Sequence, residues 1–285
     1  MKARDEMSEN EIEVSLLSPT LGAEISGVDL SDTLSPDIIS RLRRALLDHG
    51  VIFFRDQDLT PDRQMIFAGY FGELAEYPFV SGLDGYPLVI PILKLEDETR
   101  NFGGIWHSDT AYLPEPPMGT ILHARELPKI GGDTVFADMY AAYEALSDGM
   151  KAMLAPLRAL NSANKQRVSD TRKNRIEDSG KDASGVQTEA VHPVIRTHPE
   201  TGRKALYINA AHTVRFDGMS EAESAPLLAY LFAHQISEEF ICRFKWSPGA
   251  VVFWDNRCTQ HYPVNDYYGY RRLLHRITLK GDVPR

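Results

Sequence analysis

The chain has 285 residues, of which 43% are hydrophobic and 25% are charged, and its formal net charge is −9. This balance is typical of a folded globular protein and excludes a disordered chain, a collagen-like repeat and a disulfide-dense mini-protein. Because the chain is acidic and has no long Lys/Arg run, its field is unsuited to nucleic acid, and we expect no nucleic-acid partner.

Three features indicate the compartment. The first residues are charged and lack the apolar core of a signal peptide. No stretch approaches the roughly 18 apolar residues of a membrane span. Only two cysteines occur, Cys242 and Cys258, which is typical of a reducing environment. We therefore expect a cytoplasmic protein with buried thiols and no membrane partner.

The N-terminal third contains helix signals. Ser35 as N-cap and Pro36 at the first position predict a helix that ends at Gly50. A continuously apolar strand is expected over 51–54, and a second helix over 61–71. The charged residues 1–12 at the N-terminus are predicted to form a flexible tail.

Strand signals dominate the later part of the chain. Two further helices are expected to start at Asp138 and Ser147, and another helix is expected just before His234. The runs do not alternate in a βαβ rhythm, which favours a mainly β core with flanking helices. Three β-branched or aromatic runs predict strands, over 205–209, 250–254 and 273–279.

We expect one domain over 13–285. Its least apolar segment, 161–189, is rich in Lys, Arg, Asp and Ser. Such a long polar insertion is either disordered or an active-site lid, and we favour the lid over a plain solvated loop.

The segment Trp106-His107-Ser108-Asp109 carries the strongest chemical signal. In a strand, His107 and Asp109 point to the same side, about 7 Å apart at Cα, and could bind one metal ion. The pair alone is weak evidence and needs a third ligand, which His261 offers after the strand that ends at Trp254. Two imidazoles and one carboxylate are typical of non-haem Fe(II) oxygenases, whereas zinc suits this set less well.

Two arginines lie further on. On a strand, Arg272 and Arg276 point to one face, about 13 Å apart at Cα, while Arg271 points to the other and is expected to face solvent. A guanidinium suits bidentate recognition of a carboxylate or sulfonate, although internal pairing with Asp or Glu is the alternative.

These motifs together resemble the taurine dioxygenase/2,4-dichlorophenoxyacetate dioxygenase (TauD/TfdA) family of Fe(II)- and 2-oxoglutarate-dependent oxygenases, over 14–282. The resemblance implies a double-stranded β-helix (jelly-roll) core with flanking helices. Besides the two segments already described, it is carried by 21–30 (LGAEISGVDL), 131–134 (GGDT), 192–194 (HPV), 254–257 (WDNR) and 259–261 (TQH).

The resemblance also implies roles for individual residues. His107, Asp109 and His261 match the Fe(II) ligands. Thr134 and Arg272 match the pair that holds the distal carboxylate of 2-oxoglutarate. Arg276 matches the arginine that meets the anionic group of the prime substrate, or otherwise lies beside the co-substrate.

The implied reaction consumes O₂ and 2-oxoglutarate, releases succinate and CO₂, and hydroxylates a C–H bond of a small anionic substrate. Compared with the taurine pattern, Tyr77 replaces a sulfonate-binding histidine, Gly103 replaces an asparagine, and His212 replaces a phenylalanine of the substrate pocket. Taurine is therefore disfavoured, and a sulfonate, a sulfate ester or an aryloxyalkanoate is expected instead. The alternatives are a metal-binding jelly roll without oxygenase activity and a Zn-dependent hydrolase. Relatives usually self-associate, so we also expect a homo-oligomer.

Overall fold

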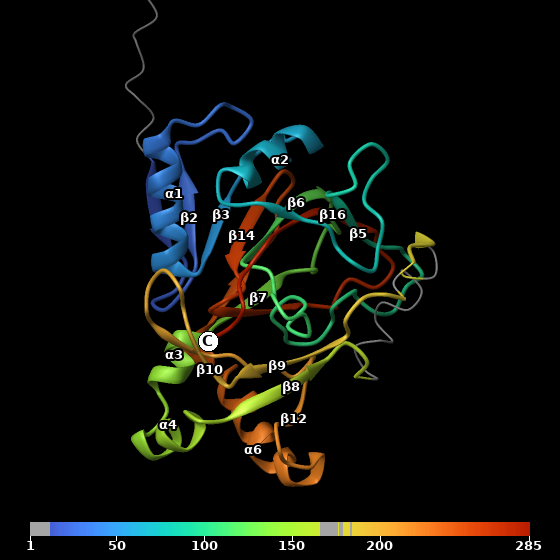
Figure 1. The fold of residues 1–285 in the computed structure, drawn as a ribbon. Helices are drawn as coiled ribbons and strands as arrows, with labels where there is room; N and C mark the ends of the chain where they lie inside the picture. The colour runs from blue at the N-terminus through green and yellow to red at the C-terminus, as the bar shows by residue number, and fades with distance from the viewer. Residues whose placement is uncertain (1–11, 166–175, 177–178, 183) are drawn as a thin grey trace, which may run out of the picture.

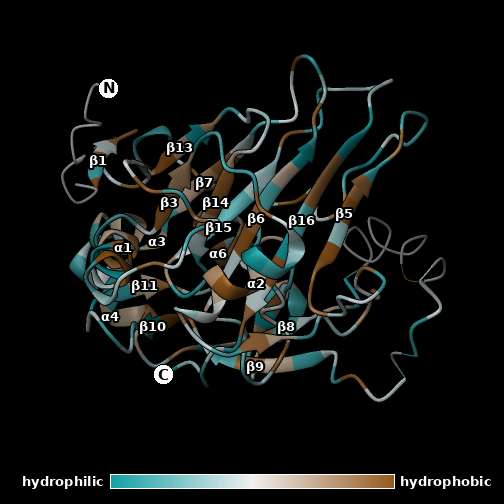
Figure 2. Ribbon diagram, turned by 90° about the horizontal axis from the view of Figure 1, so that it is seen from above, coloured by the Kyte–Doolittle hydropathy of each residue, from teal (hydrophilic) through white to brown (hydrophobic). Residues whose placement is uncertain are grey.

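The structure is a computed structural model, and it describes residues 12–165, 176, 179–182 and 184–285. More of these residues belong to strands than to helices, and Figure 2 shows the longest strands side by side in one large sheet. The strands of this sheet are β1 (Glu13–Leu16), β2 (Ala23–Ser26), β3 (Val51–Phe54), β4 (Leu74–Ala75), β5 (Ile90–Lys94), β6 (Gly119–Glu126), β14 (Val251–Asp255) and β16 (Arg272–Leu279). Their order is β1-β2-β3-β14-β6-β16-β4, and β5 also pairs with β16.

Smaller sheets face the large one (Figure 1). The first contains β7 (Thr134–Asp138), β13 (Ile241–Phe244) and β15 (Thr259–Pro263), and the second contains β8 (Arg158–Ser162), β9 (Glu189–Pro193) and β12 (Thr213–Phe216). A two-stranded sheet pairs β10 (Ile195–Thr197) with β11 (Lys204–Leu206). Within the described part of the chain these sheets do not close into a barrel.

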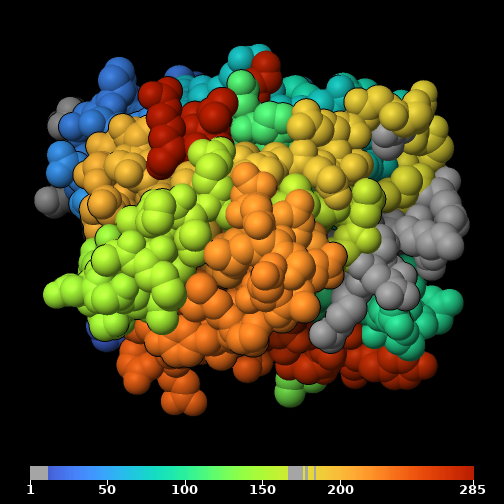
Figure 3. All heavy atoms as spheres, turned by 60° about the horizontal axis from the view of Figure 1, so that its bottom comes forward, coloured from blue at the N-terminus to red at the C-terminus, as the bar shows by residue number. Residues whose placement is uncertain are grey.

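Helices cover the outside of both layers. The helices are α1 (Pro36–His49), α2 (Pro61–Gly69), α3 (Met139–Glu144), α4 (Asp148–Leu154), α6 (Glu221–His234) and the short 3₁₀ helix η1 (Glu238–Phe240). In Figure 1, α1 and α2 lie against the large sheet, and α3, α4 and α6 lie on the opposite side of the molecule. The α3–α4 segment (yellow-green) and α6 (orange) lie side by side on the face shown in Figure 3.

The helix signals of the sequence act as predicted. The Ser35 side chain accepts a hydrogen bond from the backbone of Ile38, and Gly50 ends α1 with φ 68°. The second helix ends at Gly69, two residues before the predicted end at Phe71. The reason is that the next two N–H groups bond to carbonyls three residues back, so the last turn tightens into 3₁₀ geometry.

The run 51–54 is apolar throughout because β3 is buried on both faces. Phe54 points outward and meets the α2 side chain Phe67, with ring centroids 5.8 Å apart. Phe53 points inward and stacks on Phe244, with centroids 4.2 Å apart. The same alternation turns one face of every central strand toward the space between the sheets, where the polar side chains described below gather.

Two sequence predictions concern segments that the structure covers only in part. Residues 1–11 of the predicted tail lie outside the described residues, and Ile12 is buried in the core. Much of the predicted insertion 161–189 also lies outside them. In its described part, Lys181 donates to the backbone carbonyl of Tyr77 at 2.7 Å. The single domain and the lid remain predictions.

Cys242 and Cys258 are free and buried, as predicted. None of the described helices is both long enough and apolar enough to cross a membrane.

Candidate active site

The two candidate histidines meet although they lie far apart in the sequence. His107 donates its backbone N–H to the carbonyl of His261 at 3.1 Å, and His261 returns the bond at 2.9 Å. This is a hydrogen-bonded antiparallel pair, whose side chains project to the same side. The two imidazole rings consequently lie 4.2 Å apart between centroids.

Asp109 completes the cluster. The Thr120 hydroxyl donates to its Oδ2 at 2.7 Å, and its Oδ1 lies 3.7 Å from Nε2 of His107. Nδ1 of His107 contacts the carbonyl of Ile105 at 2.7 Å, which turns Nε2 toward the carboxylate. One ligand atom from each of the three residues lies within 4.8 Å of the others, so His107, Asp109 and His261 can share one metal ion.

The protonation states suit a metal. Burial lowers the pKa of both histidines below its ordinary value, which favours neutral imidazoles. Burial acts to raise the pKa of Asp109, but the nearby Arg276 guanidinium, with the hydrogen bond from Thr120, outweighs it and holds that pKa well below its usual range. Two neutral imidazoles and an ionised carboxylate are the donor set of non-haem Fe(II) oxygenases, so the residues present fit that ion.

A cavity of about 610 Å³, including its open mouth, extends from the cluster along β16. We call it the first chamber; Thr134 and Arg272 line it. Arg272 is buried, its Nε and Nη2 atoms have no hydrogen-bond partner, and its guanidinium lies 5.4 Å from the centre of the Trp246 ring. The Thr134 hydroxyl accepts from Trp246 Nε1 at 3.0 Å. Its own proton therefore remains available to a ligand.

A second chamber of about 420 Å³, including its open mouth, adjoins the first at the cluster, because His107 and Asp109 line both. Tyr77, His212 and Arg276 line it, together with His107 and Asp109. The Arg276 guanidinium lies 5.1 Å from the centre of the Tyr77 ring. Arg276 also borders the first chamber, so one side chain reaches both spaces.

The eight predicted site residues, and Gly103 with them, thus lie around two adjoining chambers. Arg272 and Arg276 share the inner face of β16, as predicted, whereas Arg271 points outward and pairs with Glu126 at 2.7 Å. Internal pairing, the alternative for these arginines, does not occur at Arg272 within the described residues. Arg276 does form an ion pair, with Asp109.

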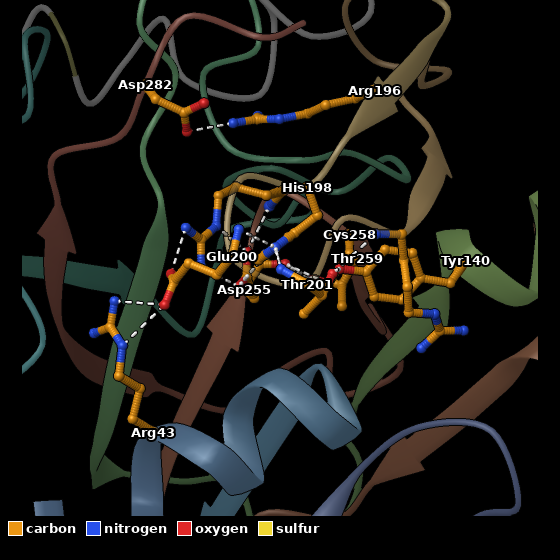
Figure 4. Close-up of polar contacts among 12 residues, drawn as sticks. Arg43, Tyr140, Arg196, His198, Glu200, Thr201, Asp255, Cys258, Thr259 and Asp282 are labelled. Carbon is orange, nitrogen blue, oxygen red and sulfur yellow. Dashed lines mark hydrogen bonds and ion pairs between the residues drawn. The ribbon is translucent and has the colours of Figure 1, made fainter. Parts of the chain in front are cut away.

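A buried polar network surrounds Asp255 (Figure 4). His198 accepts backbone N–H bonds at Nδ1, so Nε2 carries the proton and donates to Asp255 at 3.1 Å. Asp255 also accepts from Arg257 at 2.6 and 2.9 Å. Ligand-forming atoms of His198, Asp255 and Cys258 also lie close together, but Nε2 of His198 and both carboxylate oxygens are engaged in these bonds. We interpret this group as structural.

The network connects to the metal cluster through the backbone. The Thr259 hydroxyl donates to the Asp255 carbonyl at 2.7 Å, and the Ser108 hydroxyl donates to the Thr259 carbonyl at 2.9 Å. The turn before β15 is therefore tied to the segment that carries His107 and Asp109.

Sequence analysis missed two contributors, Thr120 and Trp246. Both act through a hydrogen bond to a predicted site residue. Thr120 could have been found as a hydroxyl in the apolar run of β6, whereas no local signal distinguishes Trp246.

A mainly β fold whose sheets enclose two histidines and a carboxylate defines the class of non-haem oxygenases. The model of the family described as taurine catabolism dioxygenase TauD, TfdA family matches residues 13–278. The chain belongs to this family, and it is an oxidoreductase of the alpha-ketoglutarate (2-oxoglutarate)-dependent dioxygenase type.

Individual relatives agree. The chain is 36% identical to an alpha-ketoglutarate-dependent sulfate ester dioxygenase of Pseudomonas putida, over 96% of this chain and 91% of that protein. It is 32% identical to an (S)-phenoxypropionate/alpha-ketoglutarate-dioxygenase of Sphingobium herbicidovorans, over 95% of each. A crystal structure of a putative alpha-ketoglutarate-dependent taurine dioxygenase from Burkholderia xenovorans superposes with a TM-score of 0.83 at 37% identity, over 96% of this chain and 94% of that one. The predicted family and jelly-roll fold are confirmed.

Proposed function

We propose that this enzyme binds Fe(II) and 2-oxoglutarate and hydroxylates a C–H bond of a small anionic organic substrate, with succinate and CO₂ as co-products. The observation that carries the proposal is the position of the ligand cluster. Its residues line both a chamber that holds an unpaired guanidinium and an adjoining chamber that Arg276 borders.

His107, Asp109 and His261 would hold the iron, which supplies O₂ activation coupled to oxidative decarboxylation of 2-oxoglutarate. The protein contributes geometry. The Ile105 carbonyl orients His107, and the Thr120 hydroxyl fixes one oxygen of Asp109 while leaving the other turned toward the histidines.

Arg272 and Thr134 would bind the distal carboxylate of 2-oxoglutarate. A buried guanidinium without a counterion is costly unless an anion binds it. The unpaired Nε and Nη2 atoms of Arg272 form the edge that suits a carboxylate, and the Thr134 hydroxyl keeps a free proton beside it. One bound carboxylate would therefore satisfy both the Arg272 guanidinium and the Thr134 hydroxyl.

The second chamber supports an anionic substrate with an apolar body. Arg276 supplies the charge, and aromatic side chains, among them Tyr77 and Tyr112, form much of the wall. The names of the two relatives above support a sulfate ester or an aryloxyalkanoate, and a sulfonate remains in the same chemical range. If hydroxylation falls on the carbon that bears an ester or ether oxygen, the product collapses and the oxygen-linked group leaves.

The test is succinate release from 2-oxoglutarate with Fe(II) and O₂ across a panel of alkyl sulfates, sulfonates and aryloxyalkanoates. We expect substrate-dependent succinate with at least one of them and little with taurine. An anaerobic reaction and a Zn(II)-loaded sample separate the alternatives. Turnover without O₂ would indicate a Zn-type hydrolase, and metal binding without 2-oxoglutarate consumption would indicate a non-oxygenase jelly roll.

A further inference from the structure

Lys94 is a second buried cation in the first chamber. It is the last residue of β5, it is only 4% exposed, and it lines the same cavity as Arg272 and Thr134. Its Nζ atom has no hydrogen-bond partner, and no ion pair to it occurs among the described residues. Lysine is almost never fully buried unless it is paired, so this arrangement needs a reason.

The position of Lys94 makes the absence of a partner more costly. In the antiparallel register of β5 and β16, Lys94 lies directly opposite Arg272. Directly opposite residues share one face of a sheet and lie about 5 Å apart, and like charges in this position repel each other. Two cations are thus held side by side, and both retain unpaired donors.

The aromatic surroundings position these cations without neutralising them. Nζ of Lys94 lies 4.5 Å from the centre of the Tyr267 ring, and the Arg272 guanidinium lies 5.9 Å from the same centre. Tyr267 is itself fixed, because its hydroxyl donates to Asn101 at 2.7 Å. A cation–π contact is too weak to compensate for a buried, unpaired ammonium, so an anion is still required.

We propose that Lys94 binds the distal carboxylate of 2-oxoglutarate together with Arg272 and Thr134. This inference rests on the proposed function. A carboxylate offers two oxygens with about four acceptor sites, enough for a guanidinium edge, an ammonium and a hydroxyl together. Lys94 makes the end of the first chamber selective for a dianionic 2-oxo acid over one that lacks the distal carboxylate.

Anaerobic calorimetric titration with Mn(II) in place of iron tests this without turnover. The titrants are 2-oxoglutarate and 2-oxobutyrate, which has no distal carboxylate. We expect Lys94→Met to raise the Kd of 2-oxoglutarate roughly 10- to 100-fold, the range for losing one charged hydrogen bond, and to leave that of 2-oxobutyrate within about twofold. Lys129→Met, the same change at an exposed lysine, should alter neither.

Thermal unfolding supplies a second measurement. Without ligand, Lys94→Met should melt at or above the wild-type temperature, because the substitution removes an unpaired buried charge; saturating 2-oxoglutarate should raise its melting temperature less than that of the wild type. Lys94→Gln repeats both measurements if the methionine variant does not fold. An unchanged Kd for 2-oxoglutarate, or an equal loss for both acids, would overturn the assignment of Lys94.

The Arg272→Gln variant separates this failure from failure of the proposed function. If Arg272→Gln weakens 2-oxoglutarate binding and Lys94→Met does not, only the role of Lys94 is wrong. If the wild type does not bind 2-oxoglutarate, or if Arg272→Gln binds it normally, the proposed co-substrate site is wrong as well.

Discussion

Nη2 of Arg276 lies 3.0 Å from Oδ1 of Asp109, the carboxylate oxygen that lies 3.7 Å from Nε2 of His107. The same guanidinium lies over the Tyr77 ring in the second chamber. One charge therefore borders the metal ligands and the space for the substrate at the same time. Because Arg276 holds Asp109 ionised, we expect binding of an anionic substrate to influence the metal site electrostatically.

The two arginines should separate by role. Arg272→Gln should raise the requirement for 2-oxoglutarate far more than that for substrate, and Arg276→Gln should do the reverse. Loss of a charge-assisted bidentate partner costs about 2–5 kcal/mol, or roughly 30- to several thousand-fold in affinity. Kinetic titration of each variant with both ligands measures the difference. Arg271→Gln, at the exposed neighbour, is the control. If Arg276→Gln weakens only 2-oxoglutarate binding, Arg276 does not bind the substrate.

Gly103 lies in the wall of both chambers, where there is little space for a side chain. Its φ is 71°, and an added Cβ would lie 3.0 Å from the His107 ring. Gly103→Ala should therefore strain the backbone and press on a metal ligand, which lowers metal affinity by about tenfold or more. Gly180→Ala, with φ 61° and open space around it, is a control for the backbone effect alone. Equal metal affinity in both variants, measured by competition with a chelator, would show that the contact with His107 is unimportant.

The buried network around Asp255 should be a major contributor to stability. The Asp255 side chain is fully buried and pairs with Arg257 at 2.6 Å, and Arg257 has a second partner, the partly exposed Glu200, at 2.8 Å. Asp255→Asn removes the buried partner and leaves Arg257 only its pair with Glu200, so the substitution should cost about 3 kcal/mol. Glu144→Gln, which breaks an exposed pair with Arg203, should cost at most about 1 kcal/mol. Urea unfolding at pH 7 compares the two variants. Similar losses of unfolding free energy in both variants would mean that the buried network contributes no more than an exposed ion pair.

Acid should destabilise the fold through two histidines on its outer layer. His123 and His275 lie opposite each other on β6 and β16, and burial lowers the pKa of each to about 4 from 6.5. Between pH 6.5 and about 4 the unfolded chain binds protons that the folded protein does not. The two histidines therefore cost no stability above pH 6.5, where they are neutral in both states, and they lower the unfolding free energy as the pH falls through this window.

Each histidine contributes a slope of up to about 1.4 kcal/mol per pH unit. Replacing both, as His123→Asn with His275→Gln, should flatten the dependence of the unfolding free energy on pH between 4.5 and 6.5. Urea titrations across this range measure the slope. An unaltered slope would assign acid sensitivity to other groups.

Local patterns predicted much of the site. His107, Asp109 and His261 meet as predicted, and Arg272 and Arg276 share one face of β16 because side chains alternate along a strand. The strand expected for His107 and Asp109 does not form: His107 makes an isolated bridge to His261 and Asp109 lies in a turn, so the pair converges for another reason than strand alternation.

Long-range pairing was not predictable in the same way. That Lys94 lies opposite Arg272 depends on the register of β5 against β16, which no local motif specifies. The network of Asp255 depends likewise on His198 from a distant loop. The roles of the individual site residues, the oligomeric state and the compartment remain predictions.

The most direct test of the account measures O₂ uptake and succinate together, with Fe(II) and 2-oxoglutarate, in the wild type and in His107→Ala, Asp109→Ala and His261→Ala. We expect one succinate per O₂ in the wild type. Each variant should keep its fold by circular dichroism and lose the activity, because each removes one ligand of a single ion. Full activity in any one variant would remove that residue from the metal site, and activity in all three would contradict the proposed centre altogether.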